Sequence, residues 1–305
     1  MFRSIWDDIR QAFRTGNMVT RLVIINFSVF AVLGILRFVL FMFNAGHGVP
    51  EYFYDGLYLF CMPSDWQTLL WHPWSPLTYM FLHEGFWHVI SNIIFLYLFG
   101  NIIGDLVGDR RVLPIYLLGG LAGGFLFFLS AFFMYMSPYA LGASGAVMAL
   151  AGAAVTLAPD YRVMLLLLGE VRLKYIVLVM VLLDLIGIAN MSNTGGHVAH
   201  IGGFATGIFL ISRLRDGQDL LEPVHALWLK IQSWFTPGSR PRPARRKAEK
   251  VSQKNANASK SNTSASGDEP SFQERLDAIL DKIRESGYDN LSQEEKDFLF
   301  RASKK

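Results

Sequence analysis

The sequence Gly142-Ala143-Ser144-Gly145 begins one long apolar stretch of this chain, and Ala199-His200-Ile201-Gly202-Gly203 lies at the start of another. Both stretches predict helices inside a membrane, where polar side chains are costly and mark functional sites. A serine and a histidine together are the minimum set of side chains for nucleophilic catalysis. We therefore take Ser144 and His200 as the candidate catalytic residues.

The composition is that of a membrane protein. The chain has 305 residues, of which 52% are hydrophobic and 17% are charged, against about 25% charged in a soluble domain. About half of its 28 basic and 25 acidic residues follow Pro237, so the first part is more apolar still. The net charge of +3 gives no reason to expect nucleic acid as a partner, and the single cysteine, Cys61, excludes an intrachain disulfide.

Six apolar runs come close to about 20 residues, the length that a helix needs to cross a bilayer. They lie at residues 20–43, 86–106, 112–135, 144–159, 174–190 and 198–214. The sequence therefore predicts an all-α membrane protein with a six-helix bundle over residues 20–215. Residues 1–19 precede the first run, and no small-residue cleavage site follows it, so we interpret the run as an uncleaved anchor.

The basic residues alternate between the two ends of these helices. Arginines lie before the first helix, between the second and third, between the fourth and fifth, and after the sixth, whereas loops 44–85, 136–143 and 191–197 contain no lysine or arginine. Because basic loops stay on the cytoplasmic side, both termini are predicted to be cytoplasmic, in a cell (inner) membrane. The outer half of the membrane then holds four polar residues, His88, Asn92, Ser144 and His200.

The remainder of the chain differs in character. Residues 216–236 predict an amphipathic segment at the membrane interface, and residues 237–270 predict a disordered linker. Apolar residues at helical spacing and a capping box from Ser292 to Glu295 predict a small helical hairpin over residues 271–305. We interpret this hairpin as a docking or regulatory element for a cytoplasmic partner.

Ser144 has a non-catalytic alternative, because a serine in a membrane helix often donates to a carbonyl one turn back. Its surroundings favour catalysis. Gly142 and Gly145 permit close approach of the backbone, and the start of a helix leaves amide hydrogens available to an oxyanion.

His200 is preferred over His197 as the partner of Ser144. Small residues on the two helices allow close packing, and they are Gly203 and Gly207 on one helix and Gly145, Ala149 and Ala153 on the other. His197 lies in a glycine-rich segment that we expect to be a loop outside the membrane.

His88 and Asn92 are four residues apart and share a helix face. Both side chains can donate hydrogen bonds to a developing negative charge, which is the role of an oxyanion hole. The alternative is that they make two interhelical polar contacts.

A metal site is the competing interpretation. His83 and His88 are five residues apart, too far round a helix to chelate one ion. His197 and His200 are three apart, but the only candidate for a third ligand is Asp184, which we expect to pair locally. We therefore predict no metal and no cofactor.

These motifs resemble the rhomboid family of intramembrane serine proteases over about residues 70–215. The resemblance rests on His83, His88-x-x-x-Asn92, Gly142-Ala-Ser144-Gly145 and Ala199-His200-x-Gly-Gly203, in this order on six helices. It implies that Ser144 is the nucleophile and His200 the general base, a dyad with no acidic third member. It also implies an oxyanion hole made by the Ser144 amide, His88 and Asn92, with Gly142 allowing its geometry.

The resemblance implies a class of substrate as well. Such proteases cut single-span or multi-span membrane proteins within the lipid bilayer, where a substrate helix unwinds at small side chains. Two other functions stay open: a non-catalytic rhomboid-like protein that binds membrane helices, and a transporter with a midplane site. This sequence lacks the inverted repeat and the membrane carboxylates that we would expect of a transporter.

Three positions depart from the family pattern. The Trp-Arg pair of the first outer loop is Trp74-Ser75 here, and the tyrosine that often stacks on the base is Met148. An acidic residue near the end of the second helix corresponds to Asp105. None of these changes removes a proposed catalytic group.

Overall fold

The computed structural model describes residues 2–134, 137–165, 169–235, 276–279, 281–283 and 291–302. The chain divides into two compact units, Met1–Pro237 and Gly238–Lys305. The predicted linker at 237–270 lies outside the described residues.

The first unit contains a helix at each of the six predicted positions. They are α2 (Met18–Phe43), α6 (Phe86–Val107), α7 (Val112–Ser130), α8 (Ser144–Leu157), α9 (Leu173–Ala189) and α10 (Thr194–Arg215). Within the described ranges, three helical stretches are long and apolar enough to cross a membrane, namely Met18–Phe43, Phe86–Val107 and Asp109–Ser130. The chain is thus a multi-pass membrane protein.

Two predicted boundaries were wrong. Helix α7 ends at Ser130 rather than near residue 135, because apolar composition continues past the last helical residue. Helix α10 begins at Thr194, four residues earlier than expected, although glycines 195 and 196 are poor helix formers. His197 therefore lies in the first turn of α10 and not in a loop.

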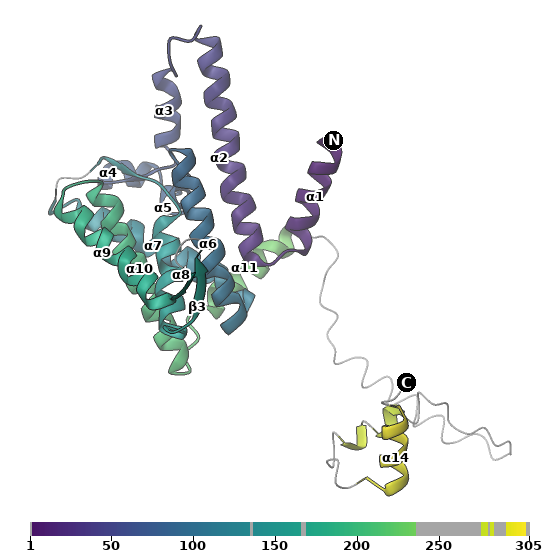
Figure 1. Cartoon of the computed structure of the whole chain (residues 1–305). Helices are drawn as coiled ribbons and strands as arrows, with labels where there is room; N and C mark the ends of the chain where they lie inside the picture. The colour runs from purple at the N-terminus through teal and green to yellow at the C-terminus, as the bar shows by residue number, and fades with distance from the viewer. Residues whose placement is uncertain are drawn as a thin grey trace. The chain divides into compact units, whose positions relative to one another are not determined.

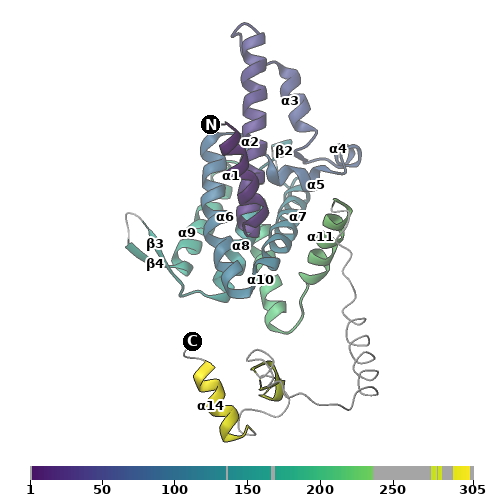
Figure 2. The ribbon, with the colours of Figure 1, turned by 90° about the vertical axis from the view of Figure 1, so that its right-hand side faces the viewer.

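Helix α8 is the central helix of this unit. It packs against α6, α7 and α10, as the two views show (Figures 1 and 2), and each residue from Gly145 to Ala154 is buried. A Cβ atom on Gly203 would collide with the backbone of Gly145, and one on Gly207 with that of Ala149. The small-residue faces predicted from the sequence therefore bring α8 and α10 into backbone contact.

The described residues are mostly helical, and they include two short strand pairs that the sequence analysis did not predict. Strand β1 (Met62–Pro63) pairs with β2 (Tyr139–Ala140), and β3 (Arg162–Leu165) pairs with β4 (Gly169–Arg172), both antiparallel. The first pair joins two loops far apart in sequence, and the second is a hairpin between α8 and α9. Two-residue strands leave no periodic signal in a sequence.

The loop between α2 and α6 folds into short helices. These are α3 (Glu51–Tyr58), α4 (Trp66–Trp71), α5 (Ser75–Thr78) and the 3₁₀ turn η1 (Tyr79–Phe81). Trp74 Nε1 donates to the carbonyl of Leu59 at 2.8 Å, and Thr78 Oγ1 donates to the carbonyl of Phe60 at 2.8 Å. Ser75 is fully buried. Trp74 and Thr78 thus tie the second half of this loop to its first half.

The N-terminus carries a helix that the sequence analysis did not predict, α1 (Phe2–Thr15). Asn17 caps α2 by accepting from the amide of Thr20 at 2.9 Å, and Asp109 accepts from the amide of Met18 at 2.8 Å. Asp109 belongs to the 3₁₀ turn η2 (Asp109–Arg111) between α6 and α7. Its carboxylate therefore ties the start of α2 to the end of α6. The far half of α2, with α3 beside it, reaches beyond the other helices (Figures 1 and 2).

Helix α11 (Glu222–Phe235) occupies the segment predicted to be amphipathic. Its apolar residues Leu227, Leu229 and Trp234 are exposed, as expected for a helix that lies against lipid. The membrane contact itself stays a prediction.

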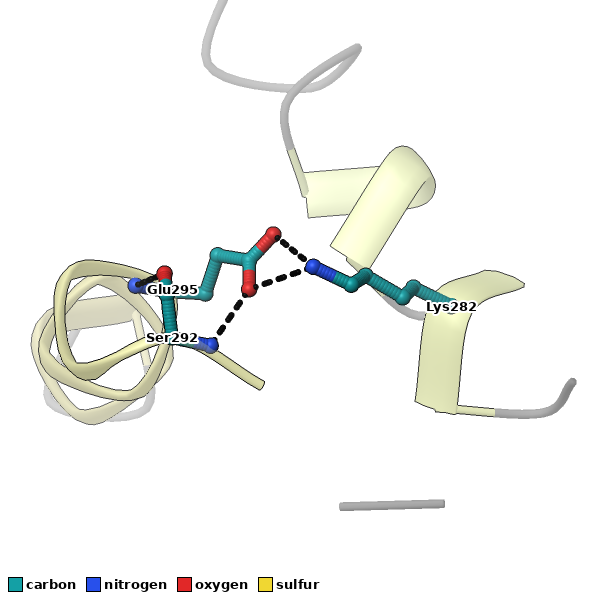
Figure 3. A network of polar contacts seen from close by, with 3 residues as sticks. All are labelled: Lys282, Ser292 and Glu295. Atoms are coloured by element: carbon teal, nitrogen blue, oxygen red, sulfur yellow. Dashed lines mark hydrogen bonds and ion pairs between the residues drawn. The ribbon is translucent and has the colours of Figure 1, made fainter. Parts of the chain in front are cut away.

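The second unit is described over parts of both predicted helices. Residues 276–279 and 281–283 are helical, as is α14 (Gln293–Ala302). Ser292 Oγ accepts from the amide of Glu295 at 3.3 Å, and the Glu295 carboxylate accepts from the amide of Ser292 at 2.7 Å, so the predicted capping box is confirmed (Figure 3). Lys282 donates to the same carboxylate at 2.8 Å and links the two helical segments (Figure 3).

Candidate active site

Ser144 is the first residue of α8, directly after a turn that requires glycine. Gly142 has a φ of +133°, a conformation that L side chains rarely adopt, and its amide donates to the carbonyl of Tyr79 at 3.0 Å. This bond fixes the segment before α8 against the end of the loop between α2 and α6. The first amide groups of a helix have no partner within it, so the turn presents Ser144 beside free hydrogen-bond donors.

Gly142 also lies against His88. A Cβ atom at position 142 would stand 2.8 Å from His88 Nε2 and 3.5 Å from Ser144 Oγ. The imidazole of His88 and the hydroxyl of Ser144 therefore flank the same glycine, and a side chain there would displace the imidazole of His88. The prediction that Gly142 allows the geometry of the site agrees with this arrangement.

Asn92 lies one turn after His88 on α6 and is only 6% exposed. Its Nδ2 donates to the carbonyl of His88 at 2.8 Å. A side-chain amide carries two hydrogens, so this bond orients the group and uses only one of them. Asn92 can still donate to a ligand in the site.

His200 has a carboxylate partner that we did not expect. Its Nδ1 lies 2.6 Å from Oδ1 of Asp184 in α9, and Nδ1 of His197 lies 2.8 Å from the same oxygen. Asp184 is 5% exposed. The expectation that this aspartate would pair locally was wrong, because its partners come from the next helix.

A cavity of about 410 Å³ brings the candidate residues together. Its wall contains all four polar residues predicted from the sequence (His88, Asn92, Ser144 and His200), together with Asp184. Among the residues that the structure describes, the wall includes His200 but not His197. The preference for His200 over His197 as the partner of Ser144 is consistent with this difference.

Two methionines line the cavity. Met148 of α8 is buried and is part of the wall together with Met180 of α9. A thioether can pack against an imidazole ring. The two methionines therefore give the wall an apolar part next to its polar residues.

His83 is a further histidine next to the candidate site. Its ring meets that of His88 edge to face, with centroids 5.1 Å apart. Burial, followed by the charge interaction with His88, lowers the pKa of His83 from 6.5 to about 4. His83 is therefore neutral at pH 7 and packs behind His88.

The residues that could hold a metal ion are Asp184, His197 and His200. One ligand atom from each lies within 4.8 Å of the others. The sequence analysis found no convincing third ligand for the two histidines, and the structure supplies one. In the sequence, Asp184 is visible as a lone carboxylate inside an apolar helix. Which residues it contacts depends on the rotation of α9 about its axis.

The part of the chain that contains this site is similar to known proteins. Residues 70–216 match the Rhomboid domain, and residues 270–305 match a family of unknown function (DUF6576). The second match coincides with the predicted hairpin and assigns no role to it.

Three relatives have similar sequences. The chain is 32% identical over 143 residues to "Rhomboid protease GluP" of Bacillus subtilis, covering 46% of this chain and 26% of that protein. It is 28% identical over 169 residues to "Presenilin-associated rhomboid-like protein A, mitochondrial" of Danio rerio, covering 53% and 43%. It is 30% identical over 157 residues to "RHOMBOID-like protein 12, mitochondrial" of Arabidopsis thaliana, covering 47% and 46%.

In each case the chain spans less than half the length of the curated relative. The matched domain nevertheless contains every residue of the candidate site, from His88 on α6 to His200 on α10. Residues 70–216 of this chain are therefore a Rhomboid domain, and the chain is similar in sequence to proteins named as rhomboids.

Proposed function

We propose that this protein is an intramembrane serine endopeptidase that uses Ser144 as its nucleophile and His200 as its general base. The observation that carries the proposal is the shared cavity, whose wall contains Ser144 from the start of α8 and His200 from the first part of α10, together with His88 and Asn92. The similarity to a rhomboid protease supports the same conclusion.

The proposed reaction begins with proton transfer. His200 Nε2 takes the proton of the Ser144 hydroxyl as Oγ attacks the substrate carbonyl, and the carbonyl oxygen becomes an oxyanion. His200 then gives this proton to the departing amine, the C–N bond breaks, and an acyl group remains on Ser144. Water repeats the two steps on the acyl group and releases the second product.

The oxyanion would be held by three donors. They are the amide of Ser144, the amide side chain of Asn92 and the imidazole of His88. Asn92 is already oriented by its bond to the His88 carbonyl, and His88 by its contact with Gly142. Donors that are fixed before the reaction stabilise the oxyanion without reorganisation.

The substrates that we propose are membrane proteins with one or more spans, cut in or near a membrane helix. A helix with complete hydrogen bonds hides its carbonyls, so cleavage requires local unwinding, which small side chains favour. We propose six membrane helices in a cell (inner) membrane with both termini cytoplasmic, supported by the alternation of basic loops. The cavity would then open in the outer half of the bilayer.

A mechanism-based serine reagent tests the nucleophile. We expect covalent labelling of the purified protein and cleavage of at least one member of a panel of tagged single-span proteins. Ser144→Ala and His200→Ala should abolish cleavage while the protein still inserts and folds. Ser91→Ala is a matched control, because Ser91 lines the same cavity from α6, and it should retain labelling and cleavage. Persistent cleavage by Ser144→Ala would exclude this mechanism.

A further inference from the structure

Asp184 is a buried carboxylate that the proposed reaction does not use. It lies on α9, its side chain is 7% exposed, and one of its oxygens meets the Nδ1 atoms of both His197 and His200. A carboxylate at membrane depth is costly unless it is paired, so its two partners account for its burial. The need to pair a buried carboxylate does not explain why one of the two partners is His200, the proposed general base.

We propose that Asp184 is a positioning residue for His200, so that the site works as a serine-histidine-aspartate arrangement. The inference rests on the proposed function, since it concerns the same serine and histidine. It departs from the dyad that the sequence motifs imply.

The argument starts from the tautomer of His200. A carboxylate only accepts hydrogen bonds, so the Nδ1 atom that lies 2.6 Å from Asp184 carries the hydrogen. In a neutral imidazole the other nitrogen, Nε2, then has a free lone pair. That nitrogen is the one available to accept the proton of Ser144, because His200 lines the cavity that contains the serine.

The same carboxylate also stabilises the charged state of the base. When His200 takes up the proton it becomes an imidazolium, and a buried carboxylate next to Nδ1 favours that charge. Asp184 therefore acts through His200 at both stages of proton transfer and does not touch the substrate.

His197 has a supporting part in this arrangement. It donates to the same oxygen at 2.8 Å from one turn earlier on α10. Two donors on one oxygen fix the carboxylate between the imidazoles and limit its rotation. Losing His197 should therefore loosen Asp184 without removing the hydrogen bond to His200.

The test compares Asp184→Asn with Asp105→Asn, because Asp105 is an exposed aspartate on the membrane helix α6 and is not in the wall of the cavity. In serine proteases the loss of the orienting aspartate lowers kcat by up to about 10⁴-fold. We expect Asp184→Asn to lower kcat at least about 10-fold with little change in KM, and to slow labelling of Ser144 in parallel. Asp105→Asn should stay within about 3-fold of wild type, and His197→Gln should lose less than Asp184→Asn.

A purely structural aspartate would behave differently. Asp184→Asn would then lower the thermal unfolding temperature and leave kcat unchanged in the protein that remains folded, and the inference would be wrong. If Ser144→Ala also cleaves substrate, the proposed function fails. If Ser144→Ala is inactive and Asp184→Asn has wild-type kcat, only the positioning role fails.

A measurement on the unmutated protein covers the case in which Asp184→Asn does not fold. Histidine ¹⁵N resonances, with His200 assigned by their loss in His200→Gln, report which ring nitrogen is protonated. We expect the neutral His200 to carry its hydrogen on Nδ1, and a hydrogen on Nε2 would overturn the inference. A wild-type enzyme that a chelator inactivates and Zn²⁺ restores would instead make the three residues metal ligands, and would also overturn it.

Discussion

Gly203 of α10 lies against the backbone carbonyl of Gly145 in α8, with no room for a side chain between them. Gly145 is the residue after Ser144, and Gly203 is three residues after His200. A close backbone contact between these two helices therefore lies next to the proposed catalytic pair. Because Gly203 has no Cβ atom, α10 can approach α8 this closely. The spacing of the two helices in turn governs how near His200 lies to Ser144.

Gly203→Ala should destabilise the protein. A methyl group at this position would collide with the Gly145 carbonyl and push α8 and α10 apart, and overpacking of this kind costs about 1–3 kcal/mol. Differential scanning fluorimetry in detergent should show a lower unfolding temperature, with a loss of cleavage. Gly104→Ala on α6 is the matched control, since a Cβ there would meet nothing within 4 Å. Equal stability of the two variants would contradict the close packing.

Asn92→Ala should reduce turnover without abolishing it. Removal of one oxyanion donor typically lowers kcat by about 10²–10³-fold, and the Ser144 amide and His88 would remain. Steady-state kinetics on a model substrate should show the change in kcat with little change in KM. His88→Ala should behave similarly. An effect confined to KM would assign these residues to substrate binding.

Stability should fall as the pH is lowered from 6.5 to about 4, in part through His83. Its pKa is about 4 in the folded protein against 6.5 as the ordinary value, because burial disfavours the charged ring. The unfolded chain therefore takes up a proton in this window that the folded protein does not, and the neutral ring contributes fully only above pH 6.5.

The variant His83→Gln cannot take up that proton. Its unfolding temperature should fall less than that of the wild type between pH 6.5 and 4, measured in the same detergent. His47→Gln is a suitable control, because His47 is an exposed histidine of the same loop between α2 and α6, and the variant should keep the wild-type dependence. Identical pH dependence in wild type and His83→Gln would show that His83 titrates normally.

Truncation after Pro237 should leave cleavage of a model substrate in detergent intact. Every proposed catalytic group lies in the unit that ends at Pro237, and no group of the second unit enters the proposed reaction. The truncated protein should label with the serine reagent at the wild-type rate. A truncated protein that is folded and inserted but inactive would show that the tail is coupled to the active site.

We expect the second unit to bind a partner protein and not to take part in catalysis. Its capping box and the bond from Lys282 to Glu295 order it from within (Figure 3). Pull-down of a cytoplasmic protein by full-length but not truncated protein would support the docking role that we propose for residues 271–305.

The sequence by itself determined the helices and the polar residues on them. Apolar runs locate α2, α6, α8 and α9 to within about two residues, because length and composition are local properties of the chain. The glycines around Ser144 and His200 likewise predicted the contact of α8 with α10, since small residues leave no alternative to close packing. The capping box at Ser292 was visible for the same reason, as both partners lie within four residues.

Only the tertiary structure decided which residues of different elements contact one another. The rotation of α9 about its axis brings Asp184 to His200, and an apolar helix without a polar face carries no periodic signal that would fix this rotation. The start of α10 at Thr194, which moves His197 into the helix, is not predicted by local propensity, because residues 195 and 196 are glycines of low helix propensity. The pairing of β1 with β2 joins residues more than 70 apart, and such pairing depends on the fold of the loops rather than on any pattern within them.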